Sequence, residues 1–219
     1  MAEMATADTI PGTPDGPRSA RKRAAILQAA TEVFLRDGYP GASMDEIAAL
    51  SAVSKQTVYK HFGSKEALFV EIVTSMTGAA GDTVHNDVVD LGKDEDLEDY
   101  LQAYALRQLS VVLTPRLMQL RRLVIGEVGR FPDLAEALYE HGPRRAVGLL
   151  AAMIERLSKR GLLTVDDPIV AATHFNWLVM SAPLNAAMLL GDRGIPRPAE
   201  LRRHADDGVR VFLAAYGRR

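Results

Sequence analysis

The stretch from residue 43 to residue 69 constrains the fold of this chain most, and it reads SMDEIAALSAVSKQTVYKHFGSKEALF. Three serines stand in it where a side-chain oxygen can cap the first turn of a helix: Ser43, Ser54 and Ser64. Glu46 follows Ser43 at the spacing of a capping box. The stretch therefore predicts three helices, each beginning directly after its serine.

The ends of these helices are also marked. Ala52 and Val53 form a tight turn after the first helix, and the second helix is predicted from Lys55 to Phe62. Gly63 ends it, because glycine tolerates the left-handed geometry found just past a helix C-terminus. Residues 43–62 thus predict a helix-turn-helix, a motif whose second helix can enter the major groove of DNA.

The second helix carries side chains suited to that role. Its first turn, where a docked recognition helix meets base edges, contains a lysine that can bind guanine, a glutamine that can bind adenine and a threonine that can contact thymine. Later donors suit phosphate oxygens, and Lys65 adds a positive charge at the positive end of the next helix. The candidate DNA contacts are Ser43, Met44, Lys55, Gln56, Thr57, Tyr59, Lys60, His61 and Lys65.

Each of these features also has an ordinary interpretation. Capped helices with an apolar face are common in helical packing, and Lys60 and Lys65 fit solvated surface charges. Tyr59 fits a half-buried core position, and His61 fits a packed histidine. No partner at ligand spacing lies near His61 in the sequence, so no metal site is predicted. The order and spacing of the whole string favour DNA binding.

The string VSKQTVYKHFGSKEALF resembles the recognition-helix signature of the TetR family of bacterial transcription regulators. Upstream, RKRAAILQAATEVFLRDGYPGASMDEIA resembles the first helix of that family and its entry into the second, so the resemblance covers residues 19–74. It implies an all-helical homodimer with an N-terminal DNA-binding domain. The larger C-terminal domain of the family dimerises and usually holds a pocket for a small-molecule effector.

The function that this resemblance implies is a ligand-responsive regulator, most often a repressor, bound as a homodimer to a palindromic operator. An activator of the same family is an alternative, as is a helical binding protein or enzyme without DNA activity. The chain departs from the family at Ala52, where glycine is common. If that residue has a positive φ, alanine costs about 1–2 kcal/mol there.

Composition limits the other classes. The chain has 219 residues, no cysteine and a net charge of −2. The absence of cysteine excludes disulfides and thiolate chemistry and fits the cytoplasm. No apolar run is long enough to span a membrane. The sequence has no metal-spaced His/Glu pair, glycine-rich phosphate loop or nucleophile elbow, so neither an enzyme nor a cofactor is predicted. Residues 19–74 carry seven Lys/Arg against six Asp/Glu, whereas acid collects in DLGKDEDLED at 90–99.

The predicted organisation is a disordered tail at 1–17, a TetR-type DNA-binding domain at 18–75 and a regulatory and dimerisation domain at 76–219. Residues 18–23 fit either a basic arm along DNA or the start of the first helix, which is expected from Ser19 to Arg36. The helix that follows Ser64 is expected to reach Met76 and to be lost at Gly78 and Gly81. Nothing predicts a strand, so the fold class is all-α.

Five further helical segments are predicted, at 97–113, 115–129, 133–159, 168–190 and 198–216. A kink or a break is expected at Gly142-Pro143, because proline clashes with the carbonyl four residues before it. The segment RLVIGEVGRFPDLAEALYEHGP at 122–143 resembles the AefR-like C-terminal subtype within the AcrR/TetR group.

The segment at 168–190 is apolar nearly all round, so it must be buried on every side. A dimer interface built from it and from 198–216 explains this, and the resemblance implies the same. Adaptable and aromatic side chains in the C-terminal part are candidates for an effector pocket, although residue type favours core or interface positions for each of them. They are Tyr104, Met118, Met153, His174, Phe175 and Trp177.

Overall fold

The computed structural model describes residues 16–85, 91–92 and 96–218. The predicted tail at 1–17 lies largely outside these residues, as do positions 90 and 93–95 of the acidic stretch. In the described part every regular element is helical, which confirms the all-α prediction. The elements are α1 Pro17–Gly41, α2 Met44–Leu50, α3 Lys55–Phe62, α4 Lys65–His85, α5 Leu97–Val112, α6 Pro115–Glu127, α7 Pro132–Tyr139, η1 Glu140–Arg144, α8 Arg145–Lys159, α9 Pro168–Leu190, η2 Gly191–Gly194 and α10 Pro198–Tyr216.

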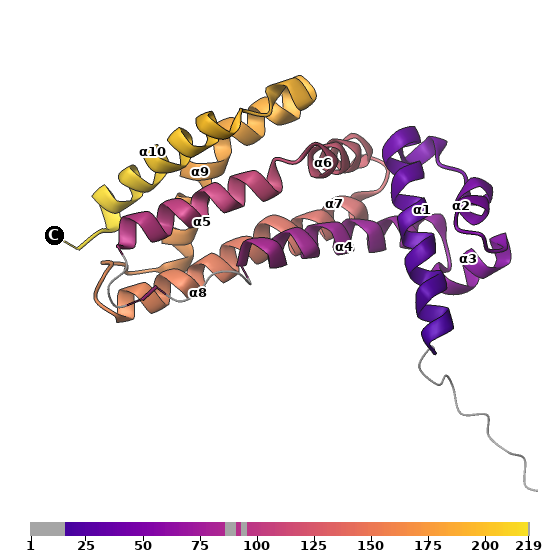
Figure 1. The fold of residues 1–219 in the computed structure, drawn as a ribbon, viewed down its shortest axis with the longest axis horizontal. Coiled ribbons are helices and arrows are strands. Elements are labelled where there is room, and N and C mark those ends of the chain that lie inside the picture. The colour runs from indigo at the N-terminus through magenta and orange to yellow at the C-terminus, as the bar shows by residue number, and fades with distance from the viewer. Residues whose placement is uncertain (1–15, 86–90, 93–95, 219) are drawn as a thin grey trace, which may run out of the picture.

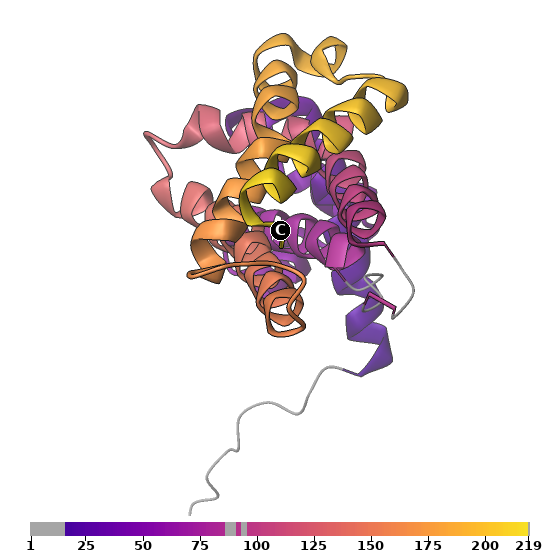
Figure 2. The ribbon, with the colours of Figure 1, turned by 90° about the vertical axis from the view of Figure 1, so that its left-hand side faces the viewer.

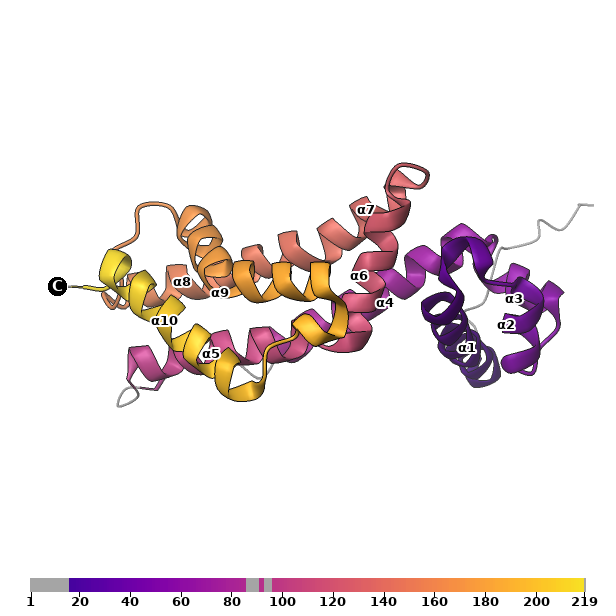
Figure 3. The ribbon, with the colours of Figure 1, turned by 90° about the horizontal axis from the view of Figure 1, so that it is seen from above.

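The helices form two groups joined by α4. Figure 1 shows α1, α2 and α3 together at one end and α5, α8, α9 and α10 at the other. Viewed from above, α6 and α7 lie beside the junction between the groups (Figure 3). In the larger group α5 packs along α10, and α9 packs against both α8 and α10. Figure 2 views this bundle from its far end, where the C-terminus faces the viewer.

The serine caps of the helix-turn-helix form as predicted. Ser54 Oγ accepts a hydrogen bond from the backbone N–H of Thr57 at 3.1 Å, and Ser64 Oγ accepts one from Ala67 at 3.0 Å. Ser43 Oγ lies 3.5 Å from the N–H of Glu46. These bonds satisfy backbone donors that would otherwise lack partners in the first turn of each helix.

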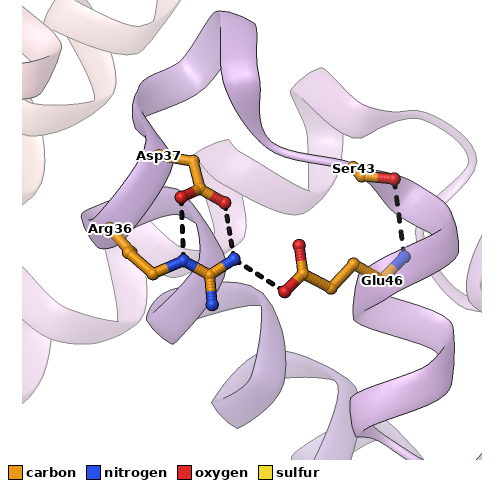
Figure 4. A network of polar contacts seen from close by, with 4 residues as sticks. All are labelled: Arg36, Asp37, Ser43 and Glu46. Atoms are coloured by element: carbon orange, nitrogen blue, oxygen red, sulfur yellow. Dashed lines mark hydrogen bonds and ion pairs between the residues drawn. The ribbon is translucent and has the colours of Figure 1, made fainter.

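The capping box predicted at Ser43 is only half formed. The Glu46 carboxylate accepts a hydrogen bond from Arg36 at 2.7 Å, and Arg36 also binds Asp37 through two nitrogens (Figure 4). The carboxylate is therefore used to join α2 to the end of α1. A charged donor on a neighbouring helix is a stronger partner than a backbone N–H.

Gly38 interrupts α1 where its end was predicted. Its φ of +74° and ψ of +173° are not helical, and one further turn carries the chain to Gly41. This turn buries the ring of Tyr39, which stacks on Phe34 at 5.9 Å and meets Phe69 and Phe131 at 5.3 and 4.5 Å between ring centroids. The glycine thereby lets the chain add an aromatic ring to the core under α1 and α4.

The prediction that α4 is lost at Gly78 and Gly81 is wrong. The helix continues to His85, and Arg145 of α8 lies across it at these glycines. Its guanidinium donates to the Gly78 carbonyl at 3.3 Å and binds Asp82 at 2.6 Å. A Cβ atom on Gly81 would lie 3.0 Å from an Arg145 nitrogen. Gly81 therefore permits the close approach of Arg145, and the contacts of Arg145 with α4 offset the low helix propensity of glycine.

At Gly142-Pro143 the structure shows neither a break nor a simple kink. Residues Glu140–Arg144 form a π-helical turn, η1, between α7 and α8. A π turn widens the hydrogen-bond ladder locally, so the proline ring fits without the clash expected in an α-helix. The segment predicted as one helix at 133–159 is thus α7, η1 and α8 in succession.

Two apolar cores hold the chain together. The larger core lies among α5, α8, α9 and α10. The smaller core lies under α1–α4 and also includes four residues of α6 and α7, namely Leu120, Val124, Leu134 and Leu138. The predicted domain boundary after residue 75 falls inside α4. The smaller core, under the N-terminal helices, is therefore completed by residues from the second half of the chain.

Candidate DNA-binding surface and effector cavity

Helix α3 has one buried face and one exposed face. Val58 and Phe62 are buried, and the Arg23 guanidinium lies 5.1 Å from the centroid of the Phe62 ring. Gln56 and Lys60 are exposed, and Tyr59 is 41% exposed despite its large apolar ring. These positions are the ones expected of a recognition helix, in which the outward side chains are available to base edges and phosphates.

Lys55, the first residue of α3, has a partner on α2. Its ammonium lies 3.0 Å from a carboxylate oxygen of Asp45, and both side chains are exposed. The hydrogen bond from this ammonium to Asp45 raises the pKa of Lys55. A DNA phosphate or base that binds Lys55 must therefore compete with Asp45, which is itself a negative charge on the same surface.

Three other predicted contacts have local structural roles. The Thr57 hydroxyl lies 2.8 Å from the Ser54 hydroxyl, inside the cap of α3. Met44 is only 7% exposed and belongs to the core under α1–α4, so its side chain does not face DNA. Its place at the start of α2 leaves its backbone as the group that could approach a phosphate. His61 is half-buried, with its ring 6.2 Å from that of Phe62.

Lys65, predicted as a phosphate contact, folds back onto α1. Its ammonium donates to the Pro40 carbonyl at 3.2 Å and lies 5.0 Å from the centroid of the Tyr39 ring. Partial burial lowers the pKa of Lys65. Two of its three N–H donors are not used by that bond, so the ammonium can hold the turn and still approach a phosphate.

The turn between α2 and α3 is strained at the predicted place. Ala52 has a φ of +54°, the one positive value at a non-glycine residue in the described part of the chain. Its N–H donates to the Ala49 carbonyl at 3.2 Å, and the N–H of Val53 donates to Ala48 at 3.1 Å. The N–H groups of both turn residues are therefore bonded, and Ala52 has left-handed geometry in this turn.

A cavity lies where α5 and α9 of the larger group meet α4, α6 and η1, and none of its lining residues belongs to α1, α2 or α3. Its interior volume is about 100 Å³, and it opens to solvent at its mouth. Helices α4, α5, α6 and α9, with η1 and the residues beside it, form its walls, which are mainly apolar. The lining residues are Thr77, Ala80, Gly81, Val84, His85, Gln108, Val112, Leu117, Met118, Leu120, Arg121, Leu138, Gly142, Pro143, Ala146, Asn176, Trp177, Met180 and Leu184.

Of the six predicted pocket residues, only Met118 and Trp177 line this cavity. Tyr104 and Phe175 are in the C-terminal core with their rings 5.9 Å apart. Met153 lines a separate pocket of about 310 Å³ beside Tyr100. His174 is exposed and lies 2.5 Å from the Tyr216 hydroxyl. Residue type indicated these positions, but helix rotation decides which side of α5, α8 and α9 faces the cavity.

The polar residues of the cavity were not predicted. Gln108 and Asn176 are buried, and the Gln108 amide donates to Asn176 Oδ1 at 2.8 Å. Arg121 and His85 also line the wall. In the sequence, Gln108 lies among apolar residues at helical spacing. This pattern could have indicated a polar side chain buried in the domain. The partner in α9 lies 68 positions away, and the sequence alone does not reveal such a contact.

His85 is held in the neutral form. Burial, aided by the nearby positive charge of Arg145, lowers its pKa from 6.5 to about 4. Its Nδ1 lies 3.4 Å from the Tyr104 hydroxyl, whose own pKa is raised by burial. At neutral pH the charge that the described residues give the cavity wall therefore comes from Arg121, since no aspartate or glutamate among them lines it.

Two other kinds of feature are absent from the described ranges. No group of three or more His, Cys, Asp or Glu residues there is arranged to hold a metal ion. No helix described is both long enough and apolar enough to cross a membrane.

Both halves of the chain match known families. Residues 26–72 match the family described as "Bacterial regulatory proteins, tetR family". Residues 99–218 match "AefR-like transcriptional repressor, C-terminal domain". The helix-turn-helix lies in the first match, and much of the cavity wall lies in the second.

Individual proteins agree with these matches. An HTH-type transcriptional repressor of Mycobacterium tuberculosis is 34% identical over 198 residues, covering 88% of this chain and 89% of the relative. The crystal structure of a TetR-family transcriptional regulator from Mesorhizobium loti superposes with a TM-score of 0.87 at 42% identity, covering 93% of this chain and 100% of that one. The Flavonoid-responsive Regulator FrrA superposes with a TM-score of 0.74 at 32% identity, covering 91% and 99%. This chain therefore belongs to the TetR family of DNA-binding transcriptional regulators, which are not enzymes, and its C-terminal part is AefR-like.

Proposed function

We propose that this protein is a ligand-responsive repressor that binds a palindromic operator as a homodimer in the cytoplasm. Residues 18–75 supply the DNA contacts, and residues 76–219 bind the effector and dimerise. The observation that carries this proposal is a shared wall: α4 and α6 line the cavity and also pack in the core beneath the helix-turn-helix. The M. tuberculosis relative is named a repressor, and FrrA is named for its response to flavonoids.

The shared helices give a route from effector to DNA. Helix α6 places Met118 and Arg121 at the cavity, while its Gln119 amide donates to the Leu35 carbonyl of α1 at 2.7 Å. Leu120 both lines the cavity and belongs to the core under α1–α4. A ligand that moves α6 therefore moves α1 and, with it, α3. It weakens DNA binding by as much as it prefers the arrangement in which the two recognition helices miss their grooves.

The test is a binding titration on a fluorescent duplex from the intergenic region beside the gene, with unlabelled random DNA as competitor. The wild type should retain the duplex under competition and protect an inverted repeat in footprinting. Gln56→Ala should alter which bases are tolerated, by about 1–3 kcal/mol at one position of each half-site. A protein that binds competitor and duplex equally well would contradict operator recognition. A reporter gene behind the same region decides repression against activation.

A further inference from the structure

The effector cavity contains a positive charge without a partner. Arg121 of α6 lines the cavity and is half-buried, and it makes no hydrogen bond or ion pair with any residue that the structure describes. Burial alone shifts its pKa, and the direction is downward. A guanidinium keeps its charge even so. Removing a charge from water without a partner is costly, so such a group is expected to have a partner in the working protein.

The next residue of α6, Arg122, differs from Arg121 because its guanidinium has partners. Arg122 donates to the Ala187 carbonyl at 3.0 Å and binds Asp192 at 3.1 Å, and it thereby joins α6 to the end of α9 and to η2. Arg121 instead lines the cavity, to whose wall the described part of the chain contributes no acidic residue. Arg122 therefore has a structural role between α6 and α9, whereas Arg121 is left to face the cavity.

A second polar group in the same wall is also unsatisfied. Gln108 of α5 is 4% exposed, and its Oε1 atom is buried without a hydrogen-bond partner in the described structure. Its amide nitrogen is already engaged with Asn176. Buried acceptors are almost always bonded in folded proteins, so a donor from a bound molecule or a water is expected at this atom.

These two groups define the chemistry of a ligand. The remaining wall is mostly aliphatic, with Trp177 at the edge as an aromatic surface. We propose that the cavity binds an apolar organic anion, whose acidic group pairs with Arg121 and whose hydroxyl or N–H group donates to Gln108 Oε1. A carboxylate, phenolate or sulfonate can accept two parallel N–H bonds from the guanidinium. This inference names the effector class of the function proposed above and rests on it.

Two fluorescent probes separate charge from apolar character. 8-Anilinonaphthalene-1-sulfonate (ANS) carries a sulfonate and an N–H group. N-Phenyl-1-naphthylamine (NPN) has the same aromatic frame and N–H group but no charge. Trp177 is the only tryptophan of the chain and lines the cavity, so quenching of its emission reports occupancy there. Titrations of the full-length wild type should show that both probes quench Trp177.

The decisive comparison uses three variants. Arg121→Met should weaken ANS binding by about tenfold or more, the loss expected for a hydrogen bond to a charged group, and should leave NPN binding unchanged. Arg121→Lys keeps the charge and should retain most of the ANS affinity. Arg116→Met is the matched control, because Arg116 is exposed on the same helix outside the cavity. It should change neither probe.

Several results would overturn the proposal. ANS that fails to quench Trp177, or an Arg121→Met variant that weakens both probes alike or neither, would show that Arg121 does not select an anion. Arg121 would then have another partner, such as a carboxylate of a second subunit. Gln108→Leu should weaken both probes, since both carry the N–H group. None of these titrations contains DNA, so a failure here leaves operator binding intact and a failure of operator binding leaves the probe result intact.

Discussion

Ala52 holds the geometry between α2 and α3 at an energetic cost. Its side chain is exposed, so no packing contact offsets the left-handed backbone. The cost is about 1–2 kcal/mol for a residue with a Cβ atom. The turn keeps this geometry because two backbone hydrogen bonds and the packing of α2 on α3 depend on it.

Ala52→Gly should therefore stabilise the protein by about 0.5–1 kcal/mol, since the relief of strain exceeds the entropy that glycine adds to the unfolded chain. Ala49→Gly is the control, because Ala49 is equally exposed but lies inside α2. It should destabilise by about 1 kcal/mol. Urea unfolding at one protein concentration measures both changes, and equal signs for the two variants would contradict the strain at Ala52.

His85 gives stability a defined pH dependence. In the unfolded chain it takes up a proton near its ordinary pKa of 6.5, whereas in the folded protein it does so only near pH 4. The unfolded state therefore binds more protons in this window, and stability falls as the pH falls from 6.5 to 4, by roughly 1–2 kcal/mol once the screening of the partly exposed ring by solvent is allowed for. His85→Gln should remove this loss in urea unfolding at pH 7.5 and 4.5. The exposed His141→Gln should not.

At the scale of helices, the ion pair between Asp45 of α2 and Lys55 of α3 competes with the binding of Lys55 to DNA. Asp45→Asn frees Lys55 and removes a negative charge from the DNA-binding surface. Operator affinity should rise by roughly two- to fivefold, the range expected for a surface ion pair, and the salt dependence should steepen. Glu136→Gln is the control for net charge, because it removes an exposed acid on α7. An equal effect of both variants in anisotropy titrations would mean that only net charge matters.

Local signals in the sequence predicted the helices well because each is set by neighbours. The serine caps of α2, α3 and α4 and the break at Gly38 act within a few residues. The continuation of α4 past Gly81 could not be predicted, because it depends on Arg145, which lies 63 positions from Asp82. The π turn at Pro143 and the ion pair of Glu46 with Arg36 of α1 were likewise not predicted, because both depend on how the helices pack.

The candidate site also has a part that local sequence predicts, the outward face of α3, and a part that it does not, the cavity lining. The two buried residues of α3, Val58 and Phe62, fix the rotation of this short helix. Its other side chains therefore face outward. The cavity is lined by a few residues from each of α4, α5, α6 and α9, so the rotations of these helices must be known together before the lining can be named. Residue type alone therefore placed Tyr104 and Phe175 in a pocket when the packing of α5 on α9 and α10 places them in the core.

For the whole molecule, the proposed dimer predicts the effect of a charge on α9. Leu189 is 75% exposed, so Leu189→Glu should cost little in a single subunit but should separate two subunits that bury it. Ile125→Glu on α6, at 51% exposure, is the matched control and should leave assembly unchanged. Sedimentation at micromolar concentration should show a dimer for the wild type and for the control. A monomeric wild type would contradict the interface.

The core that α6 and α7 complete bears on how such proteins can be recombined. Cutting the chain at residue 75 would divide α4 and would leave the apolar side chains under α1 without Leu120, Val124, Leu134 and Leu138. A chimera that joins the first part of one relative to the second part of another must therefore match these four positions as well as the splice point. The exposed face of α3 carries no such requirement. Operator preference can thus diverge between relatives by single substitutions, whereas exchange of whole DNA-binding segments demands coordinated changes across both halves of the gene.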